Sequence, residues 1–179
     1  MKKELLIKGK FVKLSKFQKE DISEQYISWL NDEEVVKFSN QRFIKHDVFS
    51  SKKYLKSFLG SKNLFLSVKL SKNNKMIGTM TAYFSFHNTV DVGIMIGDKF
   101  EWGKGYGKDA WNALLLWLEE DLHIRKITAG TLASNIGMLK LMKDSGMSHE
   151  ATKKNHEMID NQAIDILYFC KFNKKIDDN

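Results

Sequence analysis

The chain has 179 residues, of which 42% are hydrophobic and 28% are charged. This length fits a single domain over residues 1–179, and the composition is that of a folded globular protein, so we expect a flexible tail only at residues 174–179. No apolar run reaches the roughly 20 residues that span a bilayer, and residues 5–7 are too short for a signal-peptide core. The single cysteine, Cys170, excludes an internal disulfide and indicates a cytoplasmic protein.

The net charge of +7 comes almost entirely from lysine, because only Arg42 and Arg125 among the 29 basic residues are arginines. The lysines are spread along the chain and never form a block of five or six. Nucleic-acid-binding proteins favour the planar fork of arginine, so the pattern indicates a solvated surface and no nucleic-acid partner. We expect no membrane partner, and a monomer or a homodimer.

Apolar periodicity predicts one strand and two helical segments at the N-terminal end. The strand covers residues 5–14 and the first helix covers residues 21–30. The apolar face of this helix consists of Ile22, Tyr26, Trp29 and Leu30. A short helical turn follows at residues 33–38.

A second helix is predicted over residues 47–59, because Asp47 suits a helix N-cap and Gly60 suits a helix end. Three strands then follow one another with short turns between them. They cover residues 64–70, 76–86 and 90–96.

The C-terminal half begins with a glycine-punctuated loop at residues 97–107, which leads into a long helix that ends near Asp121. A strand at residues 126–132 and a helix at residues 136–143 come next. Two final strands cover residues 147–158 and 163–172. This order predicts a mixed α/β sheet, mostly antiparallel, with one βαβ crossover in the middle.

Three alternating glycines, Gly103, Gly105 and Gly107, stand between a predicted strand and the start of the long helix. Without Cβ atoms they let the backbone turn sharply and bring consecutive N–H groups close to a ligand. At a helix N-terminus such N–H groups and the helix dipole favour a phosphate or pyrophosphate. Lys104 and Lys108 would add positive charge at its rim. A loop that merely enters the helix is the alternative interpretation.

Two other phosphate-binding loops fail on the sequence. A P-loop requires GxxxxGK[ST], but Gly103-Lys104 is followed by Gly105, so the magnesium-binding hydroxyl is missing. A dinucleotide-binding turn follows its strand closely and pairs with an acid after the next strand. Residues 97–102 separate the glycines from their strand, and residues 131–135 contain no acid.

Four segments in order resemble the GCN5-related N-acetyltransferase (GNAT) superfamily, in particular the branch related to ribosomal-protein N-terminal acetyltransferases. They cover residues 76–172, and residues 26–38 fit the same branch less specifically. The segments are Asp91-Val92-Gly93-Ile94, Trp102-Gly103-Lys104-Gly105-Tyr106-Gly107 through Ala110, Asn135 through Ser145-Gly146-Met147, and Asp165-Ile166-Leu167-Tyr168.

The resemblance implies a GNAT fold, with a central, mostly antiparallel, twisted sheet of about seven strands and helices on both faces. It also implies a splay between the fourth and fifth strands that admits acetyl-coenzyme A as co-substrate, without a metal. The residues implied in cofactor binding are Ile94, Met95, Ile96, Trp102, Gly103, Lys104, Gly105, Tyr106, Gly107, Lys108 and Asn135. Asn135 equally suits a helix N-cap, and the two roles are compatible.

The chain departs from the family pattern at three positions. Trp102 replaces the glutamine or arginine of the general signature, so we expect no polar contact from this side chain. Met138 stands where a serine is frequent. Met142 stands where many members have a tyrosine that protonates the departing thiolate, which motivates a second hypothesis, a coenzyme A-binding module without catalysis.

Acetyl transfer needs a neutral amine and a polarised carbonyl, and the strand N–H near Ile94 or Met95 could supply the polarisation. An N-terminal amine has a pKa near ~8 against ~10.4 for lysine, so it needs little help to lose its proton. Asp91 is the first candidate for a general base, acting through water, and Glu101 is the second. His87, in a predicted turn, is a third.

The acceptor pocket is expected to form between the N-terminal helices and the loop at residues 38–43. Candidate acceptor contacts are Trp29, Asn40 and Arg42, whose guanidinium could bind a carboxylate or phosphate or could lie on the surface. Two acceptors stay open, a protein N-terminal amine and a small amine such as an amino sugar on a nucleotide carrier.

Overall fold

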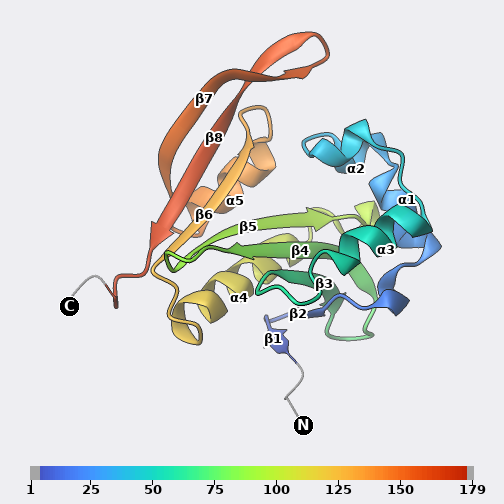
Figure 1. Cartoon of the computed structure of the whole chain (residues 1–179), viewed down its shortest axis with the longest axis horizontal. Helices are drawn as coiled ribbons and strands as arrows, with labels where there is room; N and C mark the ends of the chain where they lie inside the picture. The colour runs from blue at the N-terminus through green and yellow to red at the C-terminus, as the bar shows by residue number, and fades with distance from the viewer. Residues whose placement is uncertain (1–4, 177–179) are drawn as a thin grey trace.

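The computed structural model describes residues 5–176 of the chain. An eight-stranded sheet forms its centre, in the order β1-β2-β3-β4-β5-β6-β8-β7 (Figure 1). The strands are β1 (Leu6–Lys8), β2 (Val12–Lys16), β3 (Leu64–Leu70), β4 (Met76–Phe84), β5 (Thr89–Ile96), β6 (Lys126–Leu132), β7 (Ser148–Ile159) and β8 (Gln162–Phe172). The α-helices are α1 (Glu24–Leu30), α2 (Glu33–Val36), α3 (Val48–Lys56), α4 (Tyr106–Glu120) and α5 (Ile136–Asp144). Short 3-10 helices occur at η1 (Lys19–Asp21), η2 (Asn40–Phe43) and η3 (Lys99–Glu101).

Every neighbouring pair of strands is antiparallel except β5 and β6, which are parallel and joined through α4. The predicted mixed sheet with one crossover is therefore confirmed. The expected number of about seven strands is one short, because residues 5–14 form two strands instead of one. The Asp109 carboxylate, from the first turn of α4, accepts N–H bonds from Lys10 (2.9 Å) and Phe11 (2.7 Å) and holds the chain in a turn between β1 and β2.

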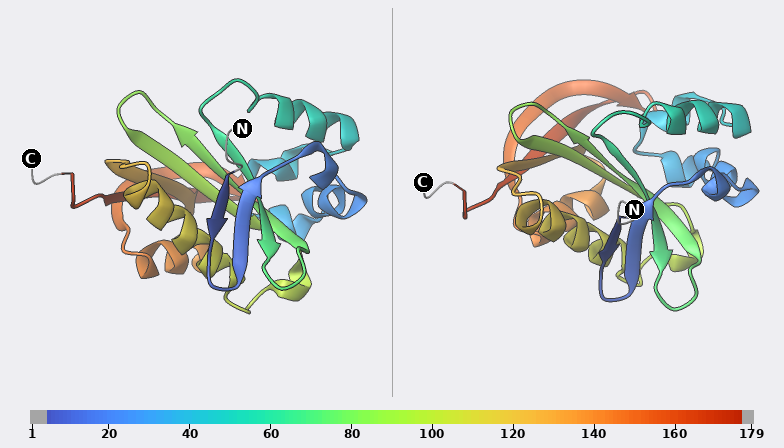
Figure 2. Two further views of the ribbon diagram at one scale, coloured as in Figure 1. Left: turned by 90° about the horizontal axis from the view of Figure 1, so that it is seen from below. Right: turned by 60° about the horizontal axis from the view of Figure 1, so that its bottom comes forward.

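Helices cover both faces of the sheet, as predicted (Figure 2). The alternation of side chains along β3 shows how. Leu66 points to the face that α4 covers with Trp111 and Leu114, all of them buried. Phe65 points the other way, into an aromatic cluster with residues of α1 and α3. In this cluster its ring stacks on that of Phe17 with centroids 4.3 Å apart. The sheet thus separates two apolar layers.

Caps decide where the N-terminal helices begin. The predicted cap at Asp47 is confirmed, since its carboxylate accepts the Ser50 N–H at 2.7 Å. The start expected at Asp21 is wrong, because Ser23 caps α1 by accepting the Tyr26 N–H. Asp21 lies before α1, in η1, and forms an ion pair with Lys69 at 2.7 Å.

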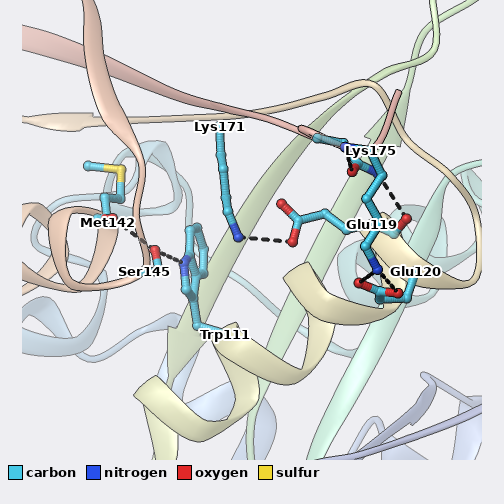
Figure 3. Close-up of polar contacts among 8 residues, drawn as sticks. Trp111, Glu119, Glu120, Met142, Ser145, Lys171 and Lys175 are labelled. Carbon is cyan, nitrogen blue, oxygen red and sulfur yellow. Dashed lines mark hydrogen bonds and ion pairs between the residues drawn. The ribbon is translucent and has the colours of Figure 1, made fainter. Parts of the chain in front are cut away.

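Strand β8 and the turn that follows it contact the end of α4 through ion pairs (Figure 3). Lys171 pairs with Glu119 at 2.9 Å, and the Lys175 ammonium pairs with Glu120 at 2.6 Å. Residues 174–176 form a turn, and the remainder of the expected flexible tail, residues 177–179, lies outside the described residues. No helix within residues 5–176 is long and apolar enough to cross a membrane. The cytoplasmic location stays a prediction.

Candidate active site

Strands β5 and β6 pair over three positions only and then separate. The last pair joins Asp91 to Thr128, so β5 has no partner on this side from Val92 to Ile96. On its other side β5 stays paired with β4 as far as Ile96, opposite Gly78. The fourth and fifth predicted strands, residues 90–96 and 126–132, are β5 and β6, so this opening is the splay that the family resemblance implies. It leaves one edge of β5 open to a ligand.

The hydrogen-bond alternation of an antiparallel pair shows which groups of β5 face the splay. Ser85 N–H donates to Thr89 O and Gly97 N–H donates to Ile77 O, both at 2.9 Å. Every second residue of β5 between Thr89 and Gly97, including Met95, therefore bonds to β4 through its main chain. The residues in between direct their main-chain N–H and C=O groups into the splay. The sequence pointed to the N–H of Ile94 or of Met95 as the group that polarises the carbonyl. The N–H of Ile94 is the one that faces the opening.

Trp102 closes the far end of the splay. Its indole N–H donates to the Ile96 carbonyl at 2.7 Å, and its side chain stays partly exposed. The expectation that Trp102 makes no polar contact is wrong, because the indole N–H satisfies a strand carbonyl that the separation of β6 leaves unpaired.

The glycine loop begins α4 with a run of free amides. Gly103 and Gly105 have φ of 73° and 82°, a left-handed conformation that favours glycine, and α4 starts at the next residue, Tyr106. Trp102 N–H donates to Lys99 O and Asp109 N–H donates to Gly105 O. Between them, the six N–H groups of residues 103–108 have no acceptor within residues 5–176. Such a run at a helix N-terminus, beside the splay, suits a pyrophosphate.

The two lysines of this loop are paired with acids at its rim. Lys104 contacts Glu101 at 2.8 Å, and Lys108 contacts Asp144 at 3.0 Å. Both ammonium groups are about half exposed, and exposed pairs of this kind are weak, so both can turn towards a phosphate. The Lys104 ammonium, followed by that of Lys75, lowers the pKa of Glu101. Glu101 is thus a stable carboxylate of the loop.

Asp91 lies at the closed end of the splay, where its carboxylate accepts the Thr128 hydroxyl at 2.9 Å. Desolvation by the surrounding protein raises the pKa of Asp91, and this hydrogen bond opposes the rise. Its side chain shares a face of β5 with Gly93 and Met95, because alternate residues of a strand point the same way. A carboxylate with a raised pKa is a stronger base than an ordinary one.

A cavity of about 570 Å³ opens on this same face of β5, between the sheet and α1, η2 and α3. Ile94 and Met95 of β5 belong to its wall. The lining residues are Tyr26, Leu30, Ser39, Gln41, Ile44, His46, Ser50, Ser51, Lys53, Tyr54, Ser57, Phe65, Thr79, Met80, Thr81, Gly93, Ile94 and Met95. The sequence suggested the N-terminal helices and the loop that holds η2, but not β4. The alternation of Thr79 and Thr81 in an otherwise apolar strand is the signal that could have revealed this wall.

The three acceptor contacts expected from the sequence do not line this cavity. Trp29 is 6% exposed and packs against Gly97 at the end of β5, and Asn40 is exposed on η2. Arg42 lines a second cavity, between α2, η2 and the tip of the β7–β8 hairpin. Its guanidinium binds Glu157 of β7 at 2.6 Å and donates to Ser39 O at 2.9 Å. Arg42 therefore connects the η2 loop to the hairpin, which reaches over towards α2 in Figures 1 and 2.

The family model described as "Acetyltransferase (GNAT) domain" matches residues 12–148 of the chain. That match includes β5, the splay and the glycine loop. The chain belongs to the GNAT acetyltransferase family. The GNAT membership predicted from the glycine loop and its neighbouring motifs is confirmed.

Solved structures share the fold of this GNAT acetyltransferase over nearly their whole length. A GNAT-family acetyltransferase from Bacillus anthracis is 21% identical with a TM-score of 0.81, covering 95% of this chain and 99% of that one. The ribosomal L7/L12 α-N-protein acetyltransferase RimL, solved with coenzyme A, is 11% identical with a TM-score of 0.81, covering 94% and 98%. The spermidine N-acetyltransferase from Vibrio cholerae, solved with coenzyme A and spermine, is 15% identical with a TM-score of 0.80, covering 92% and 96%.

One curated relative is an uncharacterised protein of Methanocaldococcus jannaschii. It is 30% identical to this GNAT acetyltransferase over 92 residues, which are 50% of this chain and 18% of that protein. The chain therefore matches a small part of a longer relative.

Two further residues singled out in the sequence have structural roles in this GNAT acetyltransferase. Asn135 caps α5, accepting the Met138 N–H at 3.2 Å and donating to the Thr131 hydroxyl at 3.1 Å. Met142 of α5 is fully buried in the core and carries no proton to donate. His87 lies exposed beyond the end of β4.

Proposed function

We propose that this GNAT acetyltransferase moves the acetyl group of acetyl-coenzyme A to a primary amine within a ternary complex. The observation that carries the proposal is the run of free amides at residues 103–108, beside an opening in the sheet. The loop would hold the pyrophosphate of the co-substrate, with Lys104 and Lys108 turning in from its rim. The family match and the coenzyme A bound in two fold relatives support this assignment.

The free edge of β5 would hold the pantetheine arm. Ile94 offers its N–H to the splay, where it can polarise the thioester carbonyl, and Met95 and Ile96 shape the same edge. Trp102 would cover the end of the arm while bonded to Ile96 O. Asn135, which caps α5 on the opposite side of the opening, is proposed as a further contact.

The amine would approach from the cavity, because Ile94 belongs both to its wall and to the splay. The amine nitrogen attacks the thioester carbon, a C–N bond forms, the C–S bond breaks, and coenzyme A leaves as a thiolate. Asp91 would take the proton that the amine loses, through water, since it lies on the face of β5 that lines the cavity. Glu101 fits this role less well, because its ion pairs with Lys104 and Lys75 lower its pKa and so make it a weaker base.

The test is release of free thiol from acetyl-coenzyme A by the purified chain, with a panel of peptides, polyamines, aminoglycosides and nucleotide-linked amino sugars. Calorimetry with coenzyme A runs in parallel. Amine-dependent thiol release is the expected result. Tight coenzyme A binding without release on any amine would support the second hypothesis, a binding module, and absence of binding would contradict both.

A further inference from the structure

The cavity beside β5 has an unusual balance of charge for an amine-binding site. None of its described lining residues is acidic, whereas Lys53 and His46 are among them. A polyamine brings several ammonium groups, and burying them costs free energy unless carboxylates pair with them. Lys53 would repel them as well. The wall is therefore unsuited to a polycation.

Hydroxyl groups dominate the polar part of the wall. Four of its eight hydroxyl side chains are bonded within the protein, namely Ser39, Ser50, Tyr54 and Ser57. The hydroxyl groups of the other four form no hydrogen bond with any residue that the structure describes. They are Tyr26, Ser51, Thr79 and Thr81. Each can donate and accept a hydrogen bond, so together they suit a ligand that itself carries hydroxyl groups.

Ser51 is the most telling of these side chains. It is 3% exposed, its Oγ is buried without a hydrogen-bond partner, and it belongs to the cavity wall. An unpaired buried hydroxyl destabilises a folded protein, and native structures rarely keep one without a reason. A polar group on a bound ligand, reached by rotation of the Ser51 side chain towards the cavity, would supply that reason.

Apolar surfaces complete the wall. The rings of Tyr26 and Phe65 and the side chain of Leu30 belong to the same wall as the hydroxyls. Such a mixture of flat apolar surface and hydroxyl groups matches a sugar ring, which has C–H faces and hydroxyl edges. The volume of about 570 Å³ also suits a ligand of this size.

We propose that the acceptor is a hydroxyl-bearing amine of the amino-sugar class, with one hydroxyl bonded to Ser51 Oγ. The proposal rests on the acetyl-transfer function proposed above. A free amino sugar and the same sugar on a nucleoside diphosphate share this chemistry.

The experiment compares kcat/KM for thiol release with glucosamine, a nucleoside-diphosphate-linked amino sugar, spermidine and a peptide with a free N-terminal alanine. We expect one of the two sugar acceptors to exceed spermidine and the peptide by at least about tenfold. The ratio between the two sugars shows whether the carrier is recognised. A preference for spermidine or the peptide would overturn the inference and leave acetyl transfer standing, whereas no coenzyme A binding would overturn acetyl transfer itself.

Ser51→Ala tests the assigned contact. It should raise KM for the sugar acceptor about tenfold with kcat nearly unchanged, while the melting temperature stays the same or rises, because no partner in the protein is lost. Ser28→Ala, which changes an exposed hydroxyl on α1 away from the cavity, is the matched control and should alter neither quantity. An unchanged KM in Ser51→Ala would contradict the proposed hydrogen bond.

Discussion

The proposed cofactor side of this site consists of main-chain groups, and the proposed acceptor side consists of side chains. On the cofactor side, main-chain groups of one short segment, from Ile94 to Lys108, would face the ligand. On the acceptor side, side chains from α1, η2, α3 and three strands form the wall. Cofactor binding should therefore respond to backbone conformation, and acceptor choice should respond to individual side chains.

Asp91, where the two sides meet, is expected to give the largest effect. Asp91→Asn should lower kcat on the order of 100-fold, because a general base contributes at least that much, while both KM values change little. Asparagine can still accept the Thr128 hydroxyl, so the fold is kept. Asp121→Asn, an exposed carboxylate at the end of α4, is the control. Unchanged turnover in Asp91→Asn would remove the proposed base.

The raised pKa of Asp91 adds a pH dependence to the same variant. A carboxyl with a higher pKa in the folded state binds its proton more tightly than in the unfolded chain. The folded state therefore loses stability as pH rises through the two pKa values, from the unfolded to the folded one. Because Asp91 is exposed, solvent screens this effect, so Asp91→Asn should raise the melting temperature at neutral pH only slightly and leave it unchanged in acid. The variant should also abolish the acid limb of the kcat profile. A lower melting temperature at neutral pH would contradict the desolvation.

Gly105→Ala tests the backbone side with a smaller expected effect. An alanine forced into a left-handed conformation costs about 1–2 kcal/mol, so the Kd for coenzyme A should rise about tenfold if the loop changes shape to relieve it. Gly60→Ala is a matched control, since Gly60 has a similar φ of 78° and, like Gly105, has open space around its Cβ position. It should lose similar stability and keep its Kd. Equal effects of both variants on the Kd would contradict a binding role for the loop.

The link between Arg42 and Glu157 is expected to give the smallest effect and bears on the acceptor side alone. Separate Arg42→Ala and Glu157→Gln variants and their combination form a double-mutant cycle, with a coupling of about 1 kcal/mol for this partly buried pair. The acceptor KM should rise a few-fold, and the Kd for coenzyme A should not change. A selective rise for the nucleotide-linked sugar alone would show that Arg42 also meets the carrier.

The contrast between the two sides also explains what the sequence could predict. Strands β3 and β6 have the predicted ends, and the glycine loop was recognised, because each depends on a contiguous pattern of residues. The splay followed from a family resemblance carried by the same local motifs. A ligand site formed by main-chain groups depends on residues that are adjacent in the sequence, so a local sequence motif can reveal it.

Features made by distant side chains could not be predicted in this way. The turn at Gly9 depends on Asp109, about 100 residues further along the chain, so residues 5–14 looked like one strand. The cavity wall contains Ser51 of α3 together with Thr79 and Thr81 of β4, and only tertiary packing brings them into one site. Arg42 stands out in the sequence as one of only two arginines, but its partner Glu157 is 115 residues away.

Amide hydrogen exchange with and without coenzyme A tests the central claim most directly. The account predicts that ligand binding slows exchange at the amides of residues 103–108 and at Ile94, with much smaller changes at the hairpin of β7 and β8. Binding of coenzyme A without protection of the loop amides, or with protection centred elsewhere, would contradict it.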